Sequence, residues 1–427
     1  MIRWIGFLIF GLASVSHAGG SIQLKPHVVL FVSDDMGWNE VGYHGSTIAT
    51  PHIDQLAREG VQLDRFYVHP VCSPTRTALM TGRIPARMGI FSVIGRTGGV
   101  PKEERFLPEL FRQAGYQTAM SGKWHLGFAE AAYRPNARGF NQFFGFYGGG
   151  INYYSSTNTR RLGWFRNGRP VNVEGYSTDL LADEAISRIQ KRDKNKPLLL
   201  YVPFNAPHPP AEAPEALVHK YRRLGYTGRR LGHAGAIEAM DAAIGRILVV
   251  LKKEGMERNT LVMFFCDNGS GISRRSPQYE PGQLRLRGGK GTLQEGGIRV
   301  PAVIRWPGVL QPNTTSRQLM GAQDLLPTLA AAAGFEPVDT RPLDGVNCWP
   351  AILKQKRMQR PPLIVGGEGG GFAVLQGNWK LIWDQHGLNL YDIEQDPIEA
   401  KDLSTDHPLT AAELADVLRP VREKIKQ

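Results

Sequence analysis

The segment "HVVLFVSDD", residues 27–35, joins an unbroken apolar run to two adjacent acidic residues. A short apolar run of this kind is typical of a strand that is buried on both faces of a sheet. Comparable runs occur at three later places in the chain, which are "PLLLYVPF" (197–204), "TLVMFFCDNG" (260–269) and "VPAVIRWPG" (300–308). We therefore predict that these segments form strands of one central sheet.

Segments with helical spacing of apolar residues separate the predicted strands. They are "PHIDQLAREG" (51–60), "FLPELFRQAGY" (106–116), "DLLADEAISRIQKR" (179–192) and "AIEAMDAAIGRILVVLKKEG" (236–255). Strands that alternate with helices predict an α/β fold, with a mostly parallel sheet and helices on both of its faces. Ligands bind at the carboxyl ends of the strands in such folds, and the polar residues at those ends are Asp34, Asp35, Asp267 and Asn268.

The last part of the chain has a different pattern. Segments 372–384 and 388–403 indicate strands joined by tight turns, and segment 410–427 indicates a closing helix. We predict a main domain over residues 25–354, followed by a small C-terminal subdomain of antiparallel strands over residues 355–427.

The composition is that of a soluble globular protein with a basic surface. The chain has 427 residues, of which 42% are hydrophobic and 21% are charged. Its mean hydropathy of -0.27 argues against an integral membrane protein. Fifty-one basic residues against 39 acidic ones give a net charge of +12. Such a surplus suits a polyanionic partner, such as a nucleic acid, an acidic membrane, or a sulfated or phosphorylated substrate.

The first 18 residues have the pattern of a signal peptide. Arg3 precedes the apolar run "WIGFLIFGLASV", and the small residues of "SHA" follow it. This order predicts cleavage after Ala18 and export, to the periplasm or out of the cell. An uncleaved membrane anchor is the alternative, but the run is short for a span, and no later stretch is long enough to cross a bilayer.

The segment "PVCSPTRTALMTGR", residues 70–83, places a cysteine beside a predicted helix. Pro74 suits a first helical position and Gly82 suits the end of the helix. Cys72 is therefore expected just outside the helix N-terminus, where an anion or a nucleophile that meets one is favoured. The other two cysteines are Cys266 and Cys348, and the sequence leaves open whether they form a disulfide.

The acidic residues at the strand ends form a set of oxygen ligands. Three carboxylates and the amide of Asn268 suit Ca²⁺ or Mg²⁺ better than zinc. Adjacent acids after a strand also serve as turns or helix caps. The metal hypothesis rests on the presence of two such groups, each of which ends an apolar strand.

Cationic residues recur in loops that follow the predicted strands and helices. They are Lys123 and His125 in "SGKWHLG", His208 in "NAPHPP", and Lys290 in the glycine-rich "RGGKGTLQEGG". Each of them alone is more often a surface cation or a packed histidine. Together with a metal and a helix N-terminus, they form the set of groups expected around a tetrahedral anion during its transfer.

Several motifs resemble those of the type I sulfatases. "CSPTR" followed by "ALMTGR" is similar to the family signature Cys-x-Pro-x-Arg, whose cysteine is oxidised to formylglycine. Further similar segments occur in the family's order between residues 27 and 335, namely "DDMGWNEVGYHGS", "TPHIDQLAREG", "GKWHLG", "RGFNQFFGF", "APHPP", "DNG" and "GGKGTLQEGGIRVP". "GNWKLI" and "LYDIEQDPIEAKDL" resemble the family's terminal subdomain. The sequence of segments 37–46 and 122–127 is most similar to that of the arylsulfatase B type, which removes 4-sulfate from N-acetylgalactosamine.

The resemblance implies an alkaline-phosphatase-like fold and a sulfuric ester hydrolase that acts on a sulfated carbohydrate or an aryl sulfate. It also implies one Ca²⁺ held by Asp34, Asp35, Asp267 and Asn268, with the modified Cys72 near the metal. Arg76 would hold and polarise the formylglycine, and the sulfate would be surrounded by Lys123, His125, His208 and Lys290. A maturation enzyme that oxidises Cys72 is an implied partner.

The implied mechanism uses the hydrate of the aldehyde, which carries two hydroxyl groups on one carbon. One hydroxyl would attack sulfur and displace the alcohol. The other would lose its proton so that the carbonyl reforms as sulfate leaves. A histidine would protonate the leaving alcohol, and His125 and His208 are both candidates.

Three other functions fit parts of the sequence. A phosphoesterase of the same superfamily would use the same nucleophile and metal. An exported protein that only binds sulfated glycans would use basic loops, predicted at 160–169 and 219–233, which are otherwise expected to be solvated surface. Nucleic-acid binding suits a pI near 9.6, but the predicted export and the lack of a recognisable binding module argue against it.

Overall fold

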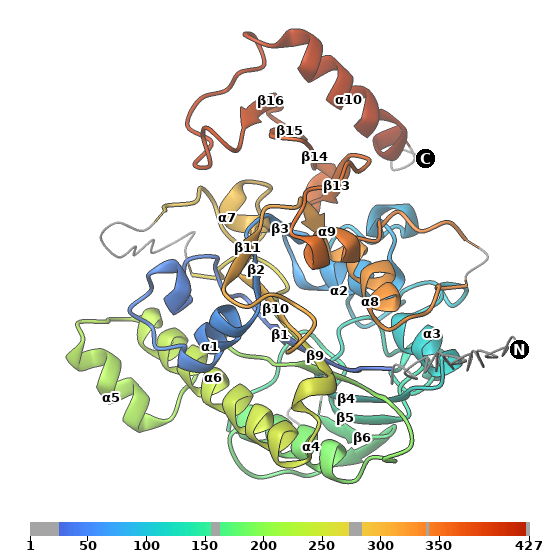
Figure 1. Cartoon of the computed structure of the whole chain (residues 1–427). Coiled ribbons are helices and arrows are strands. Elements are labelled where there is room, and N and C mark those ends of the chain that lie inside the picture. The colour runs from blue at the N-terminus through green and yellow to red at the C-terminus, as the bar shows by residue number, and fades with distance from the viewer. Residues whose placement is uncertain (1–24, 155–162, 273–283, 339–340, 424–427) are drawn as a thin grey trace, which may run out of the picture.

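The computed structural model describes residues 25–154, 163–272, 284–338 and 341–423 (Figure 1). The predicted signal peptide, residues 1–18, lies outside these ranges, as does the start of the basic segment 160–169. Among the described residues, no helix combines the length and the apolar character that a membrane span requires.

A ten-stranded sheet forms the centre of the molecule, in the order β11-β2-β10-β9-β1-β8-β4-β5-β6-β7. Its strands are β1 (His27–Ser33), β2 (Val61–Leu63), β4 (Gln117–Lys123), β5 (Gln142–Phe146), β6 (Trp164–Arg166), β7 (Arg169–Val171), β8 (Leu198–Pro203), β9 (Thr260–Cys266), β10 (Ala302–Arg305) and β11 (Thr314–Ser316). The pairs around β1, β8, β9, β4 and β5 are parallel, whereas β10, β6 and β7 run antiparallel to their neighbours. The predicted mostly parallel sheet is confirmed.

Helices lie on both faces of this sheet, as the sequence predicts (Figure 1). One group packs together as a layer and consists of α1 (Pro51–Glu59), α4 (Ser177–Gln190), α5 (Glu215–Arg223) and α6 (Arg229–Lys253). The other group consists of α2 (Cys72–Thr81), α3 (Leu107–Gln113), α8 (Leu325–Ala332) and α9 (Trp349–Lys354). Segment 219–233, expected as a basic loop, is mostly helical, because it forms the end of α5 and the start of α6.

The pairing of β1 with β9 brings the two acidic strand ends together. The strands are parallel and in register, with Ser33 opposite Cys266. Asp34 and Asp267 each follow the last residue of their strand, so their side chains start from adjacent points on one edge of the sheet. On the other side of β1, strand β8 ends at Pro203 and leads into the loop that carries His208.

A small antiparallel sheet follows the main part of the chain. It contains β13 (Leu363–Gly366), β14 (Phe372–Gln376), β15 (Trp379–Asp384) and β16 (Gly387–Asp392), in sequence order. Helix α10 (Pro408–Glu423) packs on one face of this sheet through its own apolar cluster, which includes Leu414 and Leu418. The predicted antiparallel subdomain with a closing helix is confirmed, while its boundary at residue 355 stays a prediction.

The other face of the small sheet packs on the main part of the molecule. Leu363, Val365 and Ile382 of this face share an apolar cluster with Leu293 and Ile298. Leu293 precedes the short helix α7 (Glu295–Ile298), in the glycine-rich segment that also carries Lys290. A two-stranded sheet of β3 (Phe66–Tyr67) and β12 (Met320–Gly321) lies next to this contact.

Candidate active site

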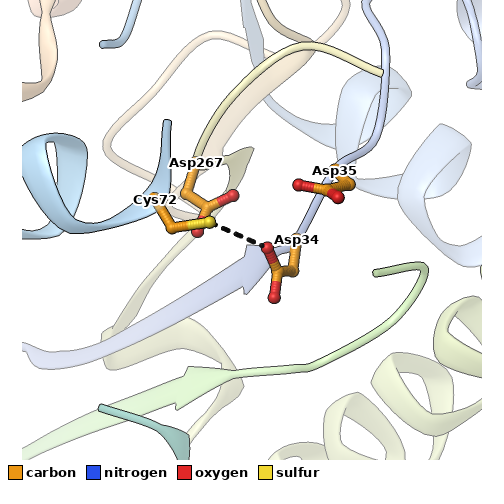
Figure 2. A group of neighbouring side chains, drawn as sticks. All are labelled: Asp34, Asp35, Cys72 and Asp267. Atoms are coloured by element: carbon orange, nitrogen blue, oxygen red, sulfur yellow. Dashed lines mark hydrogen bonds between the residues drawn. The ribbon is translucent and has the colours of Figure 1, made fainter. Parts of the chain in front are cut away.

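Four acidic or sulfur-containing side chains meet at the carboxyl edge of the central sheet (Figure 2). Asp34 and Asp35 follow β1, Asp267 follows β9, and Cys72 is the first residue of α2. Each side chain offers one ligand atom, and these atoms all lie within 4.8 Å of one another. Each of the four residues is at most 1% exposed. The cluster therefore has the donor atoms and the compactness of a metal site.

Cys72 lies inside the first turn of α2, whereas the sequence placed it just outside the helix. The helix begins at Cys72 after the extended Val71, and Pro74 is its third residue. Pro74 is still in the first turn, where a missing N–H removes no helical hydrogen bond. Gly82 ends the helix in the left-handed conformation with a φ of 66°, as predicted. The side chain of Cys72 is thereby directed at Asp34, whose Oδ1 lies 3.5 Å from Sγ.

Two buried oxygen atoms at this cluster have no hydrogen-bond partner among the residues that the structure describes. They are Oδ1 of Asp267 and Oδ1 of Asn268, and both residues are fully buried. The amide nitrogen of Asn268 donates a hydrogen bond to Oδ1 of Asp35 at 2.8 Å, which fixes the amide orientation. An unpaired buried oxygen costs about 1–3 kcal/mol, and a hard cation would remove that cost. The donor set of three carboxylates and one amide oxygen thus fits Ca²⁺.

The predicted cationic residues contact the carboxylates of the cluster. Nζ of Lys123 lies 2.5 Å from Asp34, and Nζ of Lys290 lies 2.6 Å from Asp35. Arg76 reaches Oδ2 of Asp267 with both Nε and Nη2, at 2.9 and 2.8 Å. Lys123 and Arg76 are buried, whereas the side chain of Lys290 is 24% exposed. The site is therefore open to solvent on the side of Lys290.

The three cations and three carboxylates balance one another in charge. Burial alone would lower the pKa of Lys290, but the neighbouring Cys72, Asp35 and Asp34 raise it above its usual value. Lys290 therefore stays protonated at neutral pH. A divalent ion added to this balanced set would make the site electropositive, which suits an anionic substrate.

The thiol of Cys72 is a poor nucleophile in this environment. Burial raises its pKa far above the usual value of a cysteine, and Asp267 and Asp34 add to that effect against the opposing charge of Lys123. The thiol therefore stays protonated at neutral pH, whereas thiol nucleophiles react as thiolates. Its sulfur is also a soft atom among hard oxygen donors.

The two predicted histidines differ in how exposed they are. His125 is buried, adopts a φ of 59°, and its Nδ1 has no hydrogen-bond partner. Burial, followed by the charges of Lys123 and Arg76, lowers its pKa well below the usual value, so His125 is neutral at neutral pH. The side chain of His208 is 26% exposed, and its Nε2 lies 3.9 Å from Asp35.

Glycine and proline residues bring the backbone close to these histidines. A Cβ atom on Gly149 would lie 2.6 Å from Cε1 of His125, which is closer than a side chain allows. Nδ1 of His208 lies 2.8 Å from the carbonyl oxygen of Pro209, the next residue. The loops around residues 149 and 208 therefore set the positions of the two rings.

A buried network behind the site was not predicted from the sequence. Glu40 accepts hydrogen bonds from the backbone N–H of Gly37 at 2.6 Å and from the hydroxyl of Ser270 at 3.1 Å. Its Oε2 also lies 3.0 Å from Nε2 of His233 on α6. Glu40 thus ties the loop after Asp35 to the loop after Asn268. The only signal in the sequence is the position of Glu40, shortly after the acidic pair.

Comparisons with known proteins find similar chains over most of the length. The family model described as Sulfatase matches residues 26–335. Arylsulfatase J of Mus musculus is 32% identical over 386 residues, which are 85% of this chain and 62% of that protein. N-acetylgalactosamine-6-sulfatase of Homo sapiens is 33% identical over 390 residues, 86% of this chain and 73% of that one. This chain therefore spans less than two thirds of arylsulfatase J.

Solved structures give a similar picture. Ps i-CgsB, solved in complex with k-i-k-neocarrahexaose, superposes with a TM-score of 0.86 and is 32% identical. The superposition covers 93% of each chain.

Proposed function

The chain belongs to the sulfatase family of sulfuric ester hydrolases, and from this membership we propose that it removes sulfate from a sulfated carbohydrate or an aryl sulfate. The observation that carries the proposal is the buried cluster of Asp34, Asp35, Cys72 and Asp267, with its unpaired oxygens and adjacent cations. A metal site next to a helix N-terminus and cations is suited to a tetrahedral anion.

A sulfated carbohydrate is the substrate class that the comparisons favour. N-acetylgalactosamine-6-sulfatase is named for a sulfated sugar, and Ps i-CgsB was solved with an oligosaccharide bound. The surplus of basic residues suits a sulfated polymer as well. The narrower likeness to arylsulfatase B, with its 4-sulfate specificity, stays a prediction.

Asp34, Asp35, Asp267 and Asn268 would hold the single Ca²⁺. The bound ion would supply Lewis-acid polarisation of sulfate oxygens. Lys123 and Lys290 would neutralise negative charge on the sulfate, and both are held by their ion pairs to the carboxylates.

Cys72 would be oxidised to formylglycine by a maturation enzyme. The hydrated aldehyde would supply one hydroxyl to attack sulfur and a second hydroxyl to expel sulfate afterwards. Oxidation would also replace the soft sulfur with oxygen donors that match the rest of the cluster. Arg76 is fixed beside position 72 because it also donates a hydrogen bond to the carbonyl oxygen of Lys123 at 2.7 Å.

His208 is the better placed of the two histidines to protonate the leaving alcohol. Its ring is partly exposed next to Asp35, on the side where an alcohol could leave. His125 is buried and neutral, so it is suited to orient the sulfate by a hydrogen bond from its ring. A slower release of poor leaving groups in His208→Gln than in His125→Gln would support this division.

Parallel assays with p-nitrophenyl sulfate and p-nitrophenyl phosphate test the proposed function. We expect turnover of the sulfate ester by protein produced together with a maturation enzyme, and loss of turnover after Cys72→Ala or calcium removal. Mass spectrometry of the tryptic peptide that contains Cys72 reports the conversion of the thiol to an aldehyde. Faster hydrolysis of the phosphate ester, or active protein with an unmodified thiol, would contradict the proposal.

Export is part of the same proposal. Sulfated polysaccharides lie outside the cytoplasm, and residues 1–18 have the composition of a signal peptide. N-terminal sequencing of protein recovered from the periplasm or the medium should begin at Gly19. Protein that starts at Met1 and stays in the cytoplasm would rule out export.

A further inference from the structure

A hollow lies at the edge of the central sheet opposite the candidate active site. It has a volume of about 460 Å³ and is formed by the start of β4, β5 and β8 together with the ends of α3 and α4. Strand β4 connects the two places, because Gln117 lines the hollow and Lys123 contacts Asp34 in the active site. At about 3.3 Å per residue, the two ends of β4 are roughly 20 Å apart.

The walls of this hollow are strongly basic. Five cationic residues line it against a single carboxylate, that of Asp193, and they are Arg112, Arg188, Lys191, Arg192 and Lys196. Three of the five have acidic partners, because Arg188 pairs with Glu184, Arg192 with Glu254, and Lys196 with Asp193 at 3.8 Å.

Two of the five cations are left for a ligand. Within the described ranges, neither Arg112 nor Lys191 forms an ion pair or a side-chain hydrogen bond, and both are exposed. The positive charge of the hollow also affects a partly buried residue next to its lining. Burial, followed by the charge of Arg192, lowers the pKa of the adjacent His27 to about 4.

The loop that carries Lys196 is held in place. Nε2 of Gln117 donates hydrogen bonds to the carbonyl oxygens of Asp193 and Lys196, at 2.8 and 3.0 Å. Oε1 of Gln117 accepts a hydrogen bond from the backbone N–H of Asp193 at 3.0 Å. Three hydrogen bonds from one side chain hold this wall against β4, so little ordering is needed when a ligand binds.

The lining favours a sulfated polysaccharide over a nucleic acid. Single-stranded nucleic acids bind by stacking bases on exposed aromatic side chains as well as by charge. Tyr116 is the one aromatic residue of the lining, and it is 4% exposed with its hydroxyl bonded to the carbonyl oxygen of Pro26. The hollow therefore offers charge and polar amides, such as Gln142, but no stacking surface.

We propose that this basic hollow is a second binding site for sulfated polysaccharide, distinct from the active site and used to hold the polymer on the enzyme. The choice of polymer rests on the proposed function, whereas the binding itself does not. A chain held about 20 Å from the reaction centre is kept at high local concentration there, which would lower the apparent KM for polymers but not for small esters.

The test compares the double variant Arg112→Ser/Lys191→Ser with a matched control, Arg58→Ser/Lys354→Ser. The control residues are exposed and lie on α1 and α9, outside the basic segments 160–169 and 219–233, so both variants lose one arginine and one lysine from the surface. Each pair is combined with Cys72→Ala, and binding to dextran sulfate is measured over a range of salt concentrations. Single-stranded DNA serves as the second probe.

We expect the hollow variant to bind dextran sulfate about tenfold more weakly than the control, with a smaller salt dependence because fewer ions are released. With Cys72 intact, kcat/KM for p-nitrophenyl sulfate should stay unchanged in both variants. Equal binding by the two variants would overturn the proposal, and so would tighter binding of the DNA than of dextran sulfate. Absence of any sulfatase turnover would overturn the proposed function. The binding measurement would still test the hollow, because it does not depend on turnover.

Discussion

The glycine-rich segment 287–297 contributes to two clusters of charged residues, Lys290 to one and Glu295 to the other, and the two clusters differ in how their oxygens are paired. The first is the candidate active-site cluster, in which Oδ1 of Asp267 and Oδ1 of Asn268 have no hydrogen-bond partner among the described residues. The second joins the small sheet to the main part of the molecule and consists of Lys380, Glu295 and Glu399. We call it the closed cluster.

Each carboxylate oxygen of the closed cluster lies next to a cation or a hydrogen-bond donor among the described residues, and Oε1 of Glu399, which forms no hydrogen bond, is within ion-pair distance of Lys380. Nζ of Lys380 lies 2.9 Å from Oε1 of Glu295 and 2.8 Å from Oε1 of Glu399. The hydroxyl of Tyr67 donates to Oε2 of Glu295 at 3.0 Å, and the backbone N–H of Glu295 donates to Oε2 of Glu399 at 2.8 Å. All three charged side chains are fully buried.

This difference in oxygen pairing distinguishes a structural ion cluster from a candidate ligand site. The closed cluster satisfies itself, so it can hold the small sheet against the segment that carries Lys290 without any ligand. The active-site cluster has a similar burial but keeps oxygens free on one side of its ion pairs. Burial and charge alone do not distinguish the two clusters. The difference is that Oε1 of Glu399 faces Lys380 at 2.8 Å, whereas Oδ1 of Asn268, a neutral amide oxygen, has no hydrogen-bond donor among the described residues.

The largest expected effect is the loss of activity in Asp267→Asn. The substitution removes a charged ligand of the proposed Ca²⁺ and takes the negative charge away from the group that Arg76 contacts through both Nε and Nη2. We expect kcat/KM for p-nitrophenyl sulfate to fall by about 10³-fold or more. Activity within tenfold of the wild type would mean that the open cluster is not the reaction centre.

Substitutions in the closed cluster should instead lower the stability of the folded protein. Lys380→Met leaves the buried Glu399 without its cation and Glu295 with only the more distant Arg299, at 3.6 Å, and we expect the free energy of unfolding to fall by about 3–5 kcal/mol. Urea unfolding measures this loss. The triple variant Lys380→Met/Glu295→Gln/Glu399→Gln should recover part of the stability, because no buried charge is left unpaired. A single variant as stable as the wild type would show that the cluster does not hold the subdomain.

A smaller effect concerns the pH dependence of stability near the same interface. His69 is buried, its Nδ1 lies 3.2 Å from the backbone of Gly366, and burial lowers its pKa to about 4. The unfolded chain, with a histidine pKa near 6.5, binds the proton more readily, so stability falls as the pH drops from about 6.5 to 4, by up to ~1.4 kcal/mol per pH unit.

In His69→Gln, the free energy of unfolding should fall less steeply between pH 6.5 and 4, because the contribution of His69 to the slope is removed. Denaturant unfolding at several pH values between 4 and 7 provides the measurement. His27 and His44 have similarly lowered pKa values, so part of this slope should persist in the variant. An unchanged slope would mean that His69 has the same pKa in the folded and the unfolded protein.

The smallest expected effect is that of a methyl group beside His125. Gly149→Ala would place Cβ 2.6 Å from Cε1 of the ring, so the ring must move. We expect a severalfold loss of kcat with little change in melting temperature. Gly95→Ala is the matched control, because a Cβ there meets nothing within 4 Å. Equal kcat values for the two variants would argue against a role for the position of His125.

Most of the site could be predicted from the sequence because its residues follow apolar strands. Asp34 and Asp267 directly follow β1 and β9, whose apolar runs are plain in the sequence. Lys123 was predicted for the site, but its strand β4 was not, because polar residues interrupt the apolar pattern of "QTAMSGK". The helical start of α6 was mistaken for a loop since its arginines and glycines obscure the helical spacing.

The closed cluster could not be predicted in this way. Lys380 and Glu399 lie 85 and 104 residues beyond Glu295. Their contact depends on how the small sheet docks on the main part of the molecule. A lone lysine in a strand or a glutamate in a turn carries no sign of such a partner. The pairing of the three cysteines could not be predicted from the sequence either. In the structure all three are free and buried.

Calcium content is the most direct test of the contrast between the two clusters. Protein equilibrated with calcium, passed through gel filtration and analysed by mass spectrometry of the metal should hold one ion per chain. We expect the same single ion in Glu399→Gln, whose change lies in the closed cluster, and no ion in Asp267→Asn. A calcium ion retained by Asp267→Asn, or none in the wild type, would contradict the assignment of the unpaired oxygens as metal ligands.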